Sequence, residues 1–197
     1  MVEHFGLSLI ATGDTLRSHV SDGTELGKEA RSYMDAGDLV PDDLVLRMVA
    51  ASLREARDGF VLEGFPRNVW QARALEKELD ACGRPLSAVI GLMLDDELAV
   101  KRLAGRRTCQ SCQRTYNVEL DRPRVEGVCD ACGGRLMQRA DDDELTVQRR
   151  LEVYHQQTAP VLDFYSGRRL LRCVDADGPE QEVTRRCLEA LRDLTPG

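Results

Sequence analysis

The sequence predicts an α/β protein in which a parallel sheet is flanked by helices and interrupted by a small cysteine-rich insertion. Two observations support the α/β class. Short apolar segments alternate with amphipathic segments along most of the chain. Residues 88–94 (AVIGLML) are almost entirely apolar, which is typical of a parallel strand covered on both faces. A third observation locates the insertion, because residues 108–138 lack helical periodicity and are rich in cysteine and glycine.

The first elements follow from turn and capping signals. Residues 2–5 before Gly6 fit the last turn of a helix, because glycine readily adopts the left-handed conformation that ends helices. The turn Thr12-Gly13-Asp14 then offers a capping side chain to a helix that begins at about Leu16. The predicted strands are 7–10, 60–62, 88–94 and 170–174, and the predicted helices are 2–5, 16 onward, 24–36, 41–53, 69–81, 95–107, 142–165 and 180–194.

The helix predicted from Pro41 shows the pattern used for the others. Its apolar residues recur at three- and four-residue spacing, which places them on one face. They are Leu44, Val45, Met48, Val49 and Leu53. Acidic residues in its first turn suit the positive end of the helix dipole. Gly37 ends the preceding helix, and Pro160 is expected to break the long helical tract 142–165.

Composition bounds the class of protein. Hydrophobic residues make up 42% of the chain and charged residues 31%, which is typical of a globular domain, here with a small insertion. The net charge of -7 argues against a general nucleic-acid binder. No apolar run approaches the roughly 20 residues that span a bilayer, and the first residues lack a signal-peptide layout. We therefore expect a cytoplasmic protein with no membrane partner.

Four cysteines form the strongest single motif. Two CxxC pairs, in TCQSC and VCDAC, are separated by sixteen residues, and four thiolates at that spacing can surround Zn²⁺ tetrahedrally. The candidate ligands are Cys109, Cys112, Cys129 and Cys132. Two disulfides or redox-active pairs are the alternatives, and a reducing compartment disfavours both. Gly133 and Gly134 suit the unusual backbone angles of the second knuckle. The other cysteines are expected to be buried as small hydrophobic residues: Cys82, Cys173 and Cys187.

Beyond the cysteines, motifs along nearly the whole chain resemble those of adenylate kinases of the zinc-containing, long-lid type. The stretches that carry the resemblance, in family order and spacing, are ATGDTLR, MDAGDLVPDDLV, GFVLEGFPRNVWQA, GRRTCQSCQRTYNV, GVCDACGGRLMQRADDDELTVQRRLEVYHQQTAPVLDFY and VDADG. The resemblance implies a monomeric P-loop kinase that transfers the γ-phosphoryl group of ATP to AMP and reversibly yields two ADP. It also implies Mg²⁺ bound with ATP and structural Zn²⁺ in a lid.

The resemblance further implies a division of the chain. Residues 1–106 would belong to the core and include AMP-binding helices at about 13–42. Residues 107–139, here called the lid segment, would form the zinc-binding lid, and residues 140–197 would complete the core. The implied AMP-binding residues are Thr12, Arg17, Asp38, Leu39, Val40, Gly64, Arg67, Gln71, Arg139 and Arg150. Asp38, Leu39 and Val40 would line the adenine pocket with their backbone, and Gln71 would lie at the adenine edge.

Arginines are the implied catalytic residues, because phosphoryl transfer needs positioning and positive charge rather than covalent help. They are Arg67, Arg102, Arg106, Arg139 and Arg150. A solvated helix charge is the alternative for any single arginine, but their combined spacing favours a site. The implied ATP-binding residues are Arg106, Thr115, Tyr116 and Gly178. Asp141 and Asp142 would belong to the hinge of the lid, and the Phe65-Pro66 bond is expected to be cis.

Two single positions depart from the family pattern. Glu63 stands where the family usually has an aspartate that orients Mg²⁺ through water. A strand-end carboxylate with no metal role is the alternative for this residue. Ala176 replaces a glycine that is common near the ATP base, which leaves Gly178 as the candidate there.

A glycine-rich phosphate loop of the form GxxxxGK[ST] does not occur in these 197 residues. The resembled fold begins with a strand, this loop and a helix, whereas this sequence begins at the end of that helix. The nearest match, in residues 23–29, has three spacers instead of four and lies within a helical pattern. The missing strand is central, so two neighbouring strands should have unpaired edges. We therefore expect translation to begin upstream, and a polypeptide that starts at Met1 to be poorly stable and to transfer phosphate negligibly.

Two functions of other classes share some of these motifs. A non-catalytic protein that binds nucleotide and zinc and acts by interaction would show the same AMP and cysteine patterns. A zinc-ribbon nucleic-acid binder would need a basic face with interleaved aromatic residues. Aromatic residues make up only 5% of the chain and the net charge is negative, so the sequence disfavours the ribbon.

Overall fold

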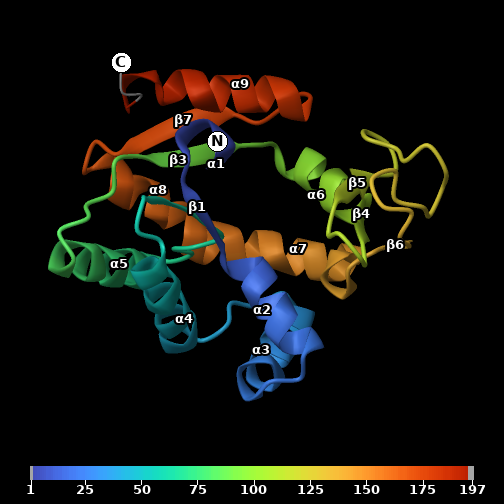
Figure 1. Cartoon of the computed structure of the whole chain (residues 1–197), viewed down its shortest axis with the longest axis horizontal. Coiled ribbons are helices and arrows are strands. Elements are labelled where there is room, and N and C mark those ends of the chain that lie inside the picture. The colour runs from blue at the N-terminus through green and yellow to red at the C-terminus, as the bar shows by residue number, and fades with distance from the viewer. Residues whose placement is uncertain (1, 195–197) are drawn as a thin grey trace.

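The computed structural model describes residues 2–194 and has the predicted α/β architecture, with helices around short parallel strands (Figure 1). The strands are β1 (Ser8–Ala11), β2 (Phe60–Glu63), β3 (Val89–Met93), β4 (Arg106–Cys109), β5 (Thr115–Asn117), β6 (Leu136–Met137) and β7 (Leu171–Asp175). The α-helices are α1 (Val2–Phe5), α2 (Thr12–Ser21), α3 (Glu25–Ala36), α4 (Asp42–Glu55), α5 (Val69–Ala81), α6 (Asp96–Ala104), α7 (Glu144–Val153), α8 (Ala159–Ser166) and α9 (Glu180–Ala190). The described elements also include 3₁₀-helices η1 (Ala140–Asp142) and η3 (Arg192–Leu194) and a π-helix, η2 (Tyr154–Thr158).

Most predicted elements are present within a few residues of their expected bounds, but two local predictions are wrong. Thr12, expected in a turn, is instead the first residue of α2. The N-cap of this helix is Ala11, which makes no side-chain capping hydrogen bond. Pro160 does not interrupt the C-terminal tract, because it lies in the first turn of α8, where a missing backbone N–H is tolerated. The π-helix η2 lies directly before this proline.

The core strands form two separate parallel pairs. β1 pairs with β2 from Ser8 opposite Phe60 onward, and β3 pairs with β7 from Val89 opposite Leu171 onward. Within residues 2–194, no third strand pairs with either of these two-stranded sheets. Each of these four strands therefore has one edge without a described partner, where the sequence predicted two such strands.

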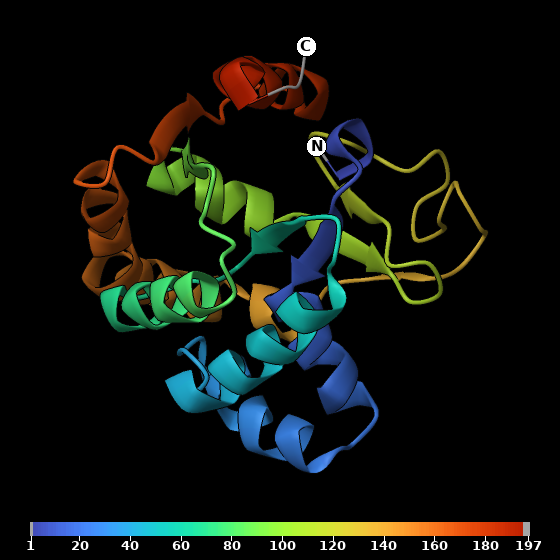
Figure 2. The same cartoon turned by 60° about the vertical axis from the view of Figure 1, so that its left-hand side comes forward.

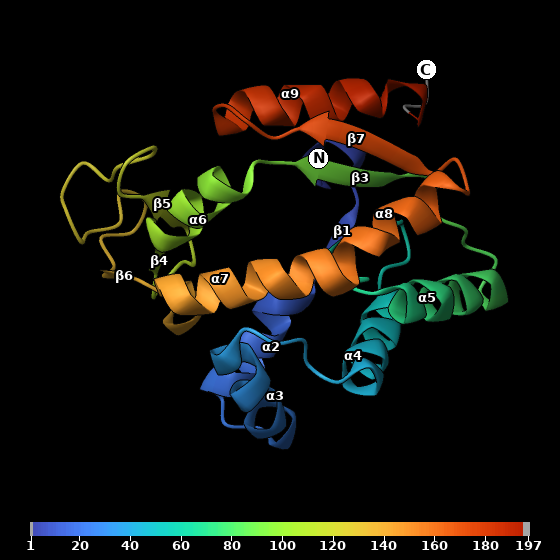
Figure 3. The same ribbon diagram turned by 180° about the vertical axis from the view of Figure 1, so that it is seen from behind.

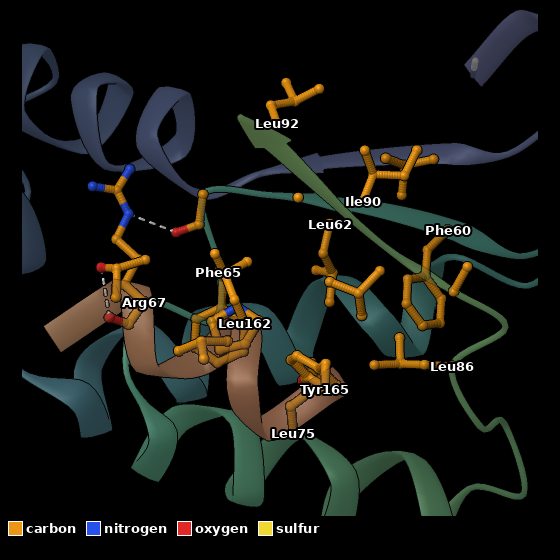
Figure 4. Close-up of a pocket in the computed structure, with 18 of the residues that line it drawn as sticks. Phe60, Leu62, Phe65, Arg67, Leu75, Leu86, Ile90, Leu92, Leu162 and Tyr165 are labelled. Carbon is orange, nitrogen blue, oxygen red and sulfur yellow. Dashed lines mark hydrogen bonds between the residues drawn. The ribbon is translucent and has the colours of Figure 1, made fainter. Parts of the chain in front are cut away.

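An apolar cavity of about 860 Å³ lies between the two strand pairs (Figure 4). Its walls include Leu62 of β2, Ile90 of β3 and Tyr165 of α8. The Tyr165 ring is fully buried, its hydroxyl has no hydrogen-bond partner in the described part of the chain, and burial raises its pKa to about 12. Leu92, near the end of β3, is 54% exposed. The prediction that residues 88–94 are covered on both faces is therefore wrong at that end.

Helices connect and cover the two strand pairs. α7, η2 and α8 form a nearly continuous rod that runs from the lid segment towards α5 (Figure 3). α9 packs against β7 at one end of the molecule, and α2 and α3 project at the opposite end (Figure 2). The largest apolar cluster lies on the side of β1 and β2 and includes the predicted stripe of α4, of which Leu44, Val45, Val49 and Leu53 are buried and Met48 is partly buried.

The lid segment contains a small sheet of its own. β4 pairs with β5 and β6 in an antiparallel sheet that lies to one side of the core in Figure 1. In residues 2–194, no helix is both long enough and apolar enough to cross a membrane.

Gly27 is expected to be essential for the contact between α2 and α3. It lies inside α3 with Lys28, so the prediction that residues 23–29 do not form a phosphate loop is confirmed. A Cβ atom at Gly27 would lie 2.0 Å from the carbonyl oxygen of His19 and 2.6 Å from the backbone nitrogen of Val20. Overpacking of this kind costs about 3 kcal/mol, and G27A should lower the melting temperature by roughly 6–12 °C.

The matched control is Gly167→Ala. At Gly167 the backbone is helical, and the nearest atom to an added Cβ is 3.6 Å away. G167A should therefore leave the melting temperature unchanged or slightly higher in a circular-dichroism melt. Equal melting temperatures for G27A and the unmodified chain would show that α2 and α3 do not pack as described.

Candidate active site and metal centre

Five arginines from distant parts of the chain converge beside the core. They are Arg17 in α2, Arg67 after β2, Arg106 at the start of β4, Arg139 before η1 and Arg150 in α7. We call these residues the arginine cluster. Burial lowers the pKa of Arg67, Arg139 and Arg150, and the charges of other cluster members lower each of them further. The guanidinium groups therefore lie within electrostatic reach of one another.

Two adjacent aspartates hold part of the arginine cluster in place. Asp142 is fully buried and accepts hydrogen bonds from Arg106, with Nε–Oδ2 and Nη2–Oδ1 distances of 2.8 and 2.5 Å. Nη1 of Arg150 lies 3.2 Å from Oδ2 of Asp141 and 3.6 Å from Oδ1 of Asp142. The residues predicted at the lid hinge thus position two arginines. The carboxylates that act on the cluster are Asp14, Asp141, Asp142 and Glu63.

The positive charge of Arg139 is only weakly compensated. Its Nε donates to Oγ1 of Thr108 at 3.1 Å, and in the described residues its ion-pair contact is a distant one, 3.9 Å from Nη2 to Oδ1 of Asp14. Asp14 already pairs closely with Arg17. Because the Arg139 side chain is only 16% exposed, water compensates its charge poorly as well. A guanidinium in this state is suited to bind an oxyanion.

The turn after β2 fixes Arg67 through the backbone. The Phe65-Pro66 bond is cis, as expected. Gly64 has a φ of 75°, and a Cβ atom there would lie 2.9 Å from Oγ1 of Thr12, so both conformation and space require glycine. Nε of Arg67 donates to the Gly64 carbonyl at 2.9 Å (Figure 4), and Thr158 of the π-helix donates to the Arg67 carbonyl at 2.8 Å.

A small pocket of about 80 Å³, here called the inner pocket, adjoins the arginine cluster. Most of the predicted AMP-binding residues line it: Thr12, Arg17, Asp38, Leu39, Val40, Gly64, Arg67, Gln71 and Arg150. Arg139 is not among its lining residues. Arg67 and Arg150 also line the cavity of about 860 Å³ between the two strand pairs, so the inner pocket adjoins that larger space.

The predicted ATP-side residues are divided between two places. Arg102 does not join the arginine cluster, because its Nη1 and Nη2 donate to the carbonyls of Ala176 and Gly178 at 2.8 and 3.0 Å. The side chain of Arg102, in α6, thus contacts Gly178 in the loop after β7. Thr115 lies exposed on β5, whereas the side chain of Tyr116 is buried inside the lid segment. The Tyr116 hydroxyl accepts from the backbone N–H of Asp130 at 2.9 Å.

The four predicted cysteine ligands meet in one cluster. Their sulfur atoms all lie within 4.8 Å of one another, and two of the Sγ–Sγ distances are 3.5 Å. A tetrahedral zinc with Zn–S bonds of about 2.3 Å needs sulfur atoms about 3.8 Å apart, so the donor set fits this ion. The sulfur atoms are too far apart for disulfides, whose bond length is about 2.05 Å. In residues 2–194 this is the one group of three or more candidate metal ligands, and Glu63 is not part of it.

The two cysteine knuckles have matching backbone geometry. The N–H of Gln113 donates to the Cys109 carbonyl at 3.0 Å, and the N–H of Gly133 donates to the Cys129 carbonyl at 2.8 Å. Both donors have left-handed φ angles, 61° and 72°, which confirms the role expected for Gly133. A Cβ atom on Gly134 would lie 2.9 Å from Sγ of Cys109, so this glycine allows the knuckles to approach each other.

The remaining cysteines differ from expectation. Cys187 is buried as predicted, but Cys82 and Cys173 are exposed, so the prediction that they are buried hydrophobic residues is wrong. Inside the lid segment, the hydrogen bond from the Tyr116 hydroxyl, 3.5 Å from Sγ of Cys129, lowers the pKa of that thiol to about 6. The lowered pKa favours the thiolate at Cys129, which is the form that binds zinc, whereas the neighbouring cysteine sulfur atoms raise the pKa of Cys132 to about 12.

Sequence reasoning missed three residues that support the site. Asp14 was expected only in a turn, yet it pairs with Arg17. Thr158 was not singled out, although it holds the Arg67 carbonyl from 91 positions away in the chain. Asp42 was noted only as an acid in the first turn of a helix, and it contacts Gln71. Such contacts depend on how distant elements pack, and no local pattern indicates them.

The parallel α/β core, the arginine cluster beside the inner pocket and the four clustered cysteines are features that the resemblance to zinc-containing adenylate kinases predicts. A sequence profile of the family described as "Adenylate kinase" matches residues 1–170. The chain belongs to the adenylate kinase family, a family of phosphotransferases. This confirms the resemblance drawn from the sequence.

Several relatives named adenylate kinase are similar along almost the whole chain. The protein from Acidothermus cellulolyticus is 50% identical over 194 residues, which cover 98% of this chain and 89% of the relative. The protein from Thermodesulfovibrio yellowstonii is 49% identical over 185 residues, covering 93% and 86%. The protein from Streptomyces coelicolor is 48% identical over 195 residues, covering 98% and 90%.

Proposed function

We propose that the protein catalyses reversible transfer of the γ-phosphoryl group from ATP to AMP, yielding two ADP. The observation that carries this proposal is the arginine cluster beside the inner pocket. The two substrates and the transferred group are all anionic, and the cluster concentrates half-buried positive charge where the predicted AMP-binding residues meet. ATP would arrive with Mg²⁺ as part of the substrate.

The proposed division of labour follows the positions of the side chains. Arg17, Arg67 and Arg150 line the inner pocket and would hold the AMP phosphate. Arg106 and Arg139, at the base of the lid segment, would face the transferring group from the other side. An oxygen of the AMP phosphate attacks the γ-phosphorus while the bond to the bridging oxygen of the leaving ADP breaks. The negative charge that develops on the transferred group is stabilised by the surrounding guanidiniums.

The outer parts of the site would handle ATP and water. Arg102, joined to Gly178 after β7, would flank the ATP base, and Thr115 of the lid segment would cover the nucleotide. Closure of the lid segment excludes water, so that AMP rather than water accepts the phosphoryl group. Cys109, Cys112, Cys129 and Cys132 would hold a structural zinc ion that keeps the lid segment rigid and takes no part in the transfer. We further propose that the protein acts as a monomer.

The proposed reaction is tested by measuring ADP formation from ATP and AMP. Because these 197 residues contain no GxxxxGK[ST] stretch, the assay uses them beside a version extended at the N-terminus by an apolar strand and such a loop. The extended polypeptide is expected to form two ADP for each ATP consumed, and the 197-residue polypeptide to transfer phosphate negligibly. Tight AMP and zinc binding without any turnover in the extended polypeptide would contradict the proposal and favour a non-catalytic nucleotide-binding protein.

A further inference from the structure

Asp42 connects the start of α4 to the base of α5 behind the inner pocket. Its Oδ1 accepts a hydrogen bond from Nδ2 of Asn68 at 2.9 Å and another from Nε2 of Gln71 at 2.7 Å. Asn68 is the N-cap of α5, and its Oδ1 accepts from the backbone N–H of Gln71 at 2.8 Å. Gln71 lines the inner pocket and is only 2% exposed. Its side chain is therefore fixed by neighbours rather than by solvent.

The two neighbours of the Gln71 amide determine which way it faces. Its Oε1 accepts from the backbone N–H of Arg67 at 2.7 Å, and that N–H can only donate. Its Nε2 donates to Asp42, and a carboxylate can only accept. A flipped amide would place an N–H group against the Arg67 N–H and a carbonyl oxygen against the Asp42 carboxylate. Both contacts therefore favour the same orientation.

This orientation leaves a defined pair of hydrogen-bonding positions on Gln71. An amide has two acceptor positions on Oε1 and two N–H groups on Nε2, and one of each is used. The remaining N–H and the remaining lone pair match a purine edge with an acceptor at N1 and an amino donor at position 6. A 6-oxopurine carries the opposite pair, a donor at N1 and an acceptor at position 6, and would be matched only by the flipped amide.

We propose that Asp42 is a specificity-determining positioning residue that fixes the Gln71 amide and so makes the inner pocket select 6-aminopurine over 6-oxopurine monophosphates. This inference rests on the proposed function, because it takes the inner pocket as the acceptor site. Asp42 acts through Gln71 and does not itself touch the base. Buried polar groups that are left unpaired by the wrong ligand are an effective source of such discrimination.

The test is the ratio of the dissociation constants of IMP and AMP for the 197-residue chain. AMP and IMP share ribose and phosphate, so the ratio isolates the purine edge. Binding can be followed by calorimetry, or by the fluorescence of Trp70, the single tryptophan, which precedes Gln71. The unmodified chain should bind AMP well over tenfold more tightly than IMP.

Asp42→Asn is the informative variant when it is combined with Asn68→Ser, because Nδ2 of Asn68 would otherwise hold the carbonyl oxygen of the new amide at the position now occupied by Oδ1 of Asp42. The substitution keeps the shape of the side chain, and without Asn68 it offers a donor as readily as an acceptor. Gln71 can then flip with its partner, although the Arg67 N–H still favours the original orientation. The IMP to AMP ratio should therefore fall about tenfold or more without inverting. Asp42→Ala removes the carboxylate that accepts from Gln71 and should also lower the IMP to AMP ratio. The inference can therefore still be tested if one of the two variants folds poorly.

Asn68→Ser is the matched control. Serine keeps an N-cap oxygen for α5 but lacks the amide that donates to Asp42, so the tie between the helices is weakened while the contact between Asp42 and Gln71 remains. N68S should leave the ratio unchanged. Parallel losses of AMP and IMP affinity in the D42N/N68S double variant and in D42A at a constant ratio would overturn the inference and leave the proposed function standing. Failure of the unmodified chain to bind AMP would overturn both.

Discussion

Arg139→Ala is expected to slow ADP formation by about 10³-fold or more without lowering the melting temperature. An arginine that stabilises the transferring phosphoryl group is typically worth about 10³–10⁵ in rate. Arg139 contributes little to the folded state, since its closest contacts are Thr108 at 3.1 Å and Asp14 at 3.9 Å. Burial and the nearby positive charges of Arg17 and Arg106 lower the pKa of Arg139. The charged guanidinium is therefore less favourable in the folded protein than in water. Removing it should leave stability equal or slightly higher.

Two further variants make this result diagnostic when rates are measured in the N-terminally extended polypeptide. Arg185→Ala removes an exposed arginine of α9 that pairs only with glutamates of its own helix in the described structure, and it should leave both rate and stability nearly unchanged. Arg106→Ala should reduce both, because it leaves the fully buried Asp142 without its two-pronged partner. A normal rate for R139A would remove Arg139 from the catalytic set.

Cys129→Ser is expected to reduce bound zinc from about one ion per chain to nearly none and to unfold the lid segment. The apolar cluster of the lid segment consists of Cys109, Tyr116, Cys129 and Leu136, which is too small to hold residues 107–139 together. Structural zinc supplies apparent folding free energies of about 10–16 kcal/mol in small zinc-finger peptides. The metal is therefore expected to provide most of the local stability. Metal analysis and the rate of proteolysis within residues 107–139 measure the two effects.

Cys82→Ser is the control for the zinc experiment, because this exposed cysteine lies at the end of α5, outside the lid segment. It should leave zinc content and proteolysis unchanged. A chelator added to the unmodified chain should reproduce the proteolysis seen with C129S. Full zinc occupancy in C129S would contradict the assignment of these four cysteines as the zinc ligands. A lid segment that resists protease without metal would contradict the expectation that bound zinc provides most of its stability.

Local patterns predicted the elements and the metal ligands well. Gly37 ends α3 with a left-handed φ of 76°, and the apolar stripe of α4 is buried, because both depend on residues close together in sequence. The cysteine cluster was predictable for the same reason, since each knuckle is closed by hydrogen bonds within six residues. The residues that line the inner pocket were predicted from the resemblance of motifs to a known family, not from periodicity.

The features that escaped prediction depend on long-range packing. The resemblance implied that Tyr116 binds ATP, yet its side chain is buried and its hydroxyl contacts Sγ of Cys129 and the backbone N–H of Asp130. The resemblance implied catalytic roles for both Arg102 and Arg106, but the Arg102 side chain donates to backbone carbonyls 74 and 76 positions away. Leu92 belongs to an apolar run, but its exposure depends on which strands lie next to β3.

The π-helix Tyr154–Thr158 makes the length of the chain in this tract as important as its composition. A π-helical turn contains about one residue more than an α-helical turn, and each α-helical residue advances the helix by about 100° around its axis. Deleting one residue from this turn would therefore leave an ordinary α-helical turn that still completes one revolution, and α8 would keep Val161 and Tyr165 on its interior face. The same deletion within the regular turns of α7 would instead rotate α8 by about 100°. Val161 and Tyr165 would then turn away from the interior, and Thr158 would lose the carbonyl of Arg67, although no residue of the arginine cluster need be removed.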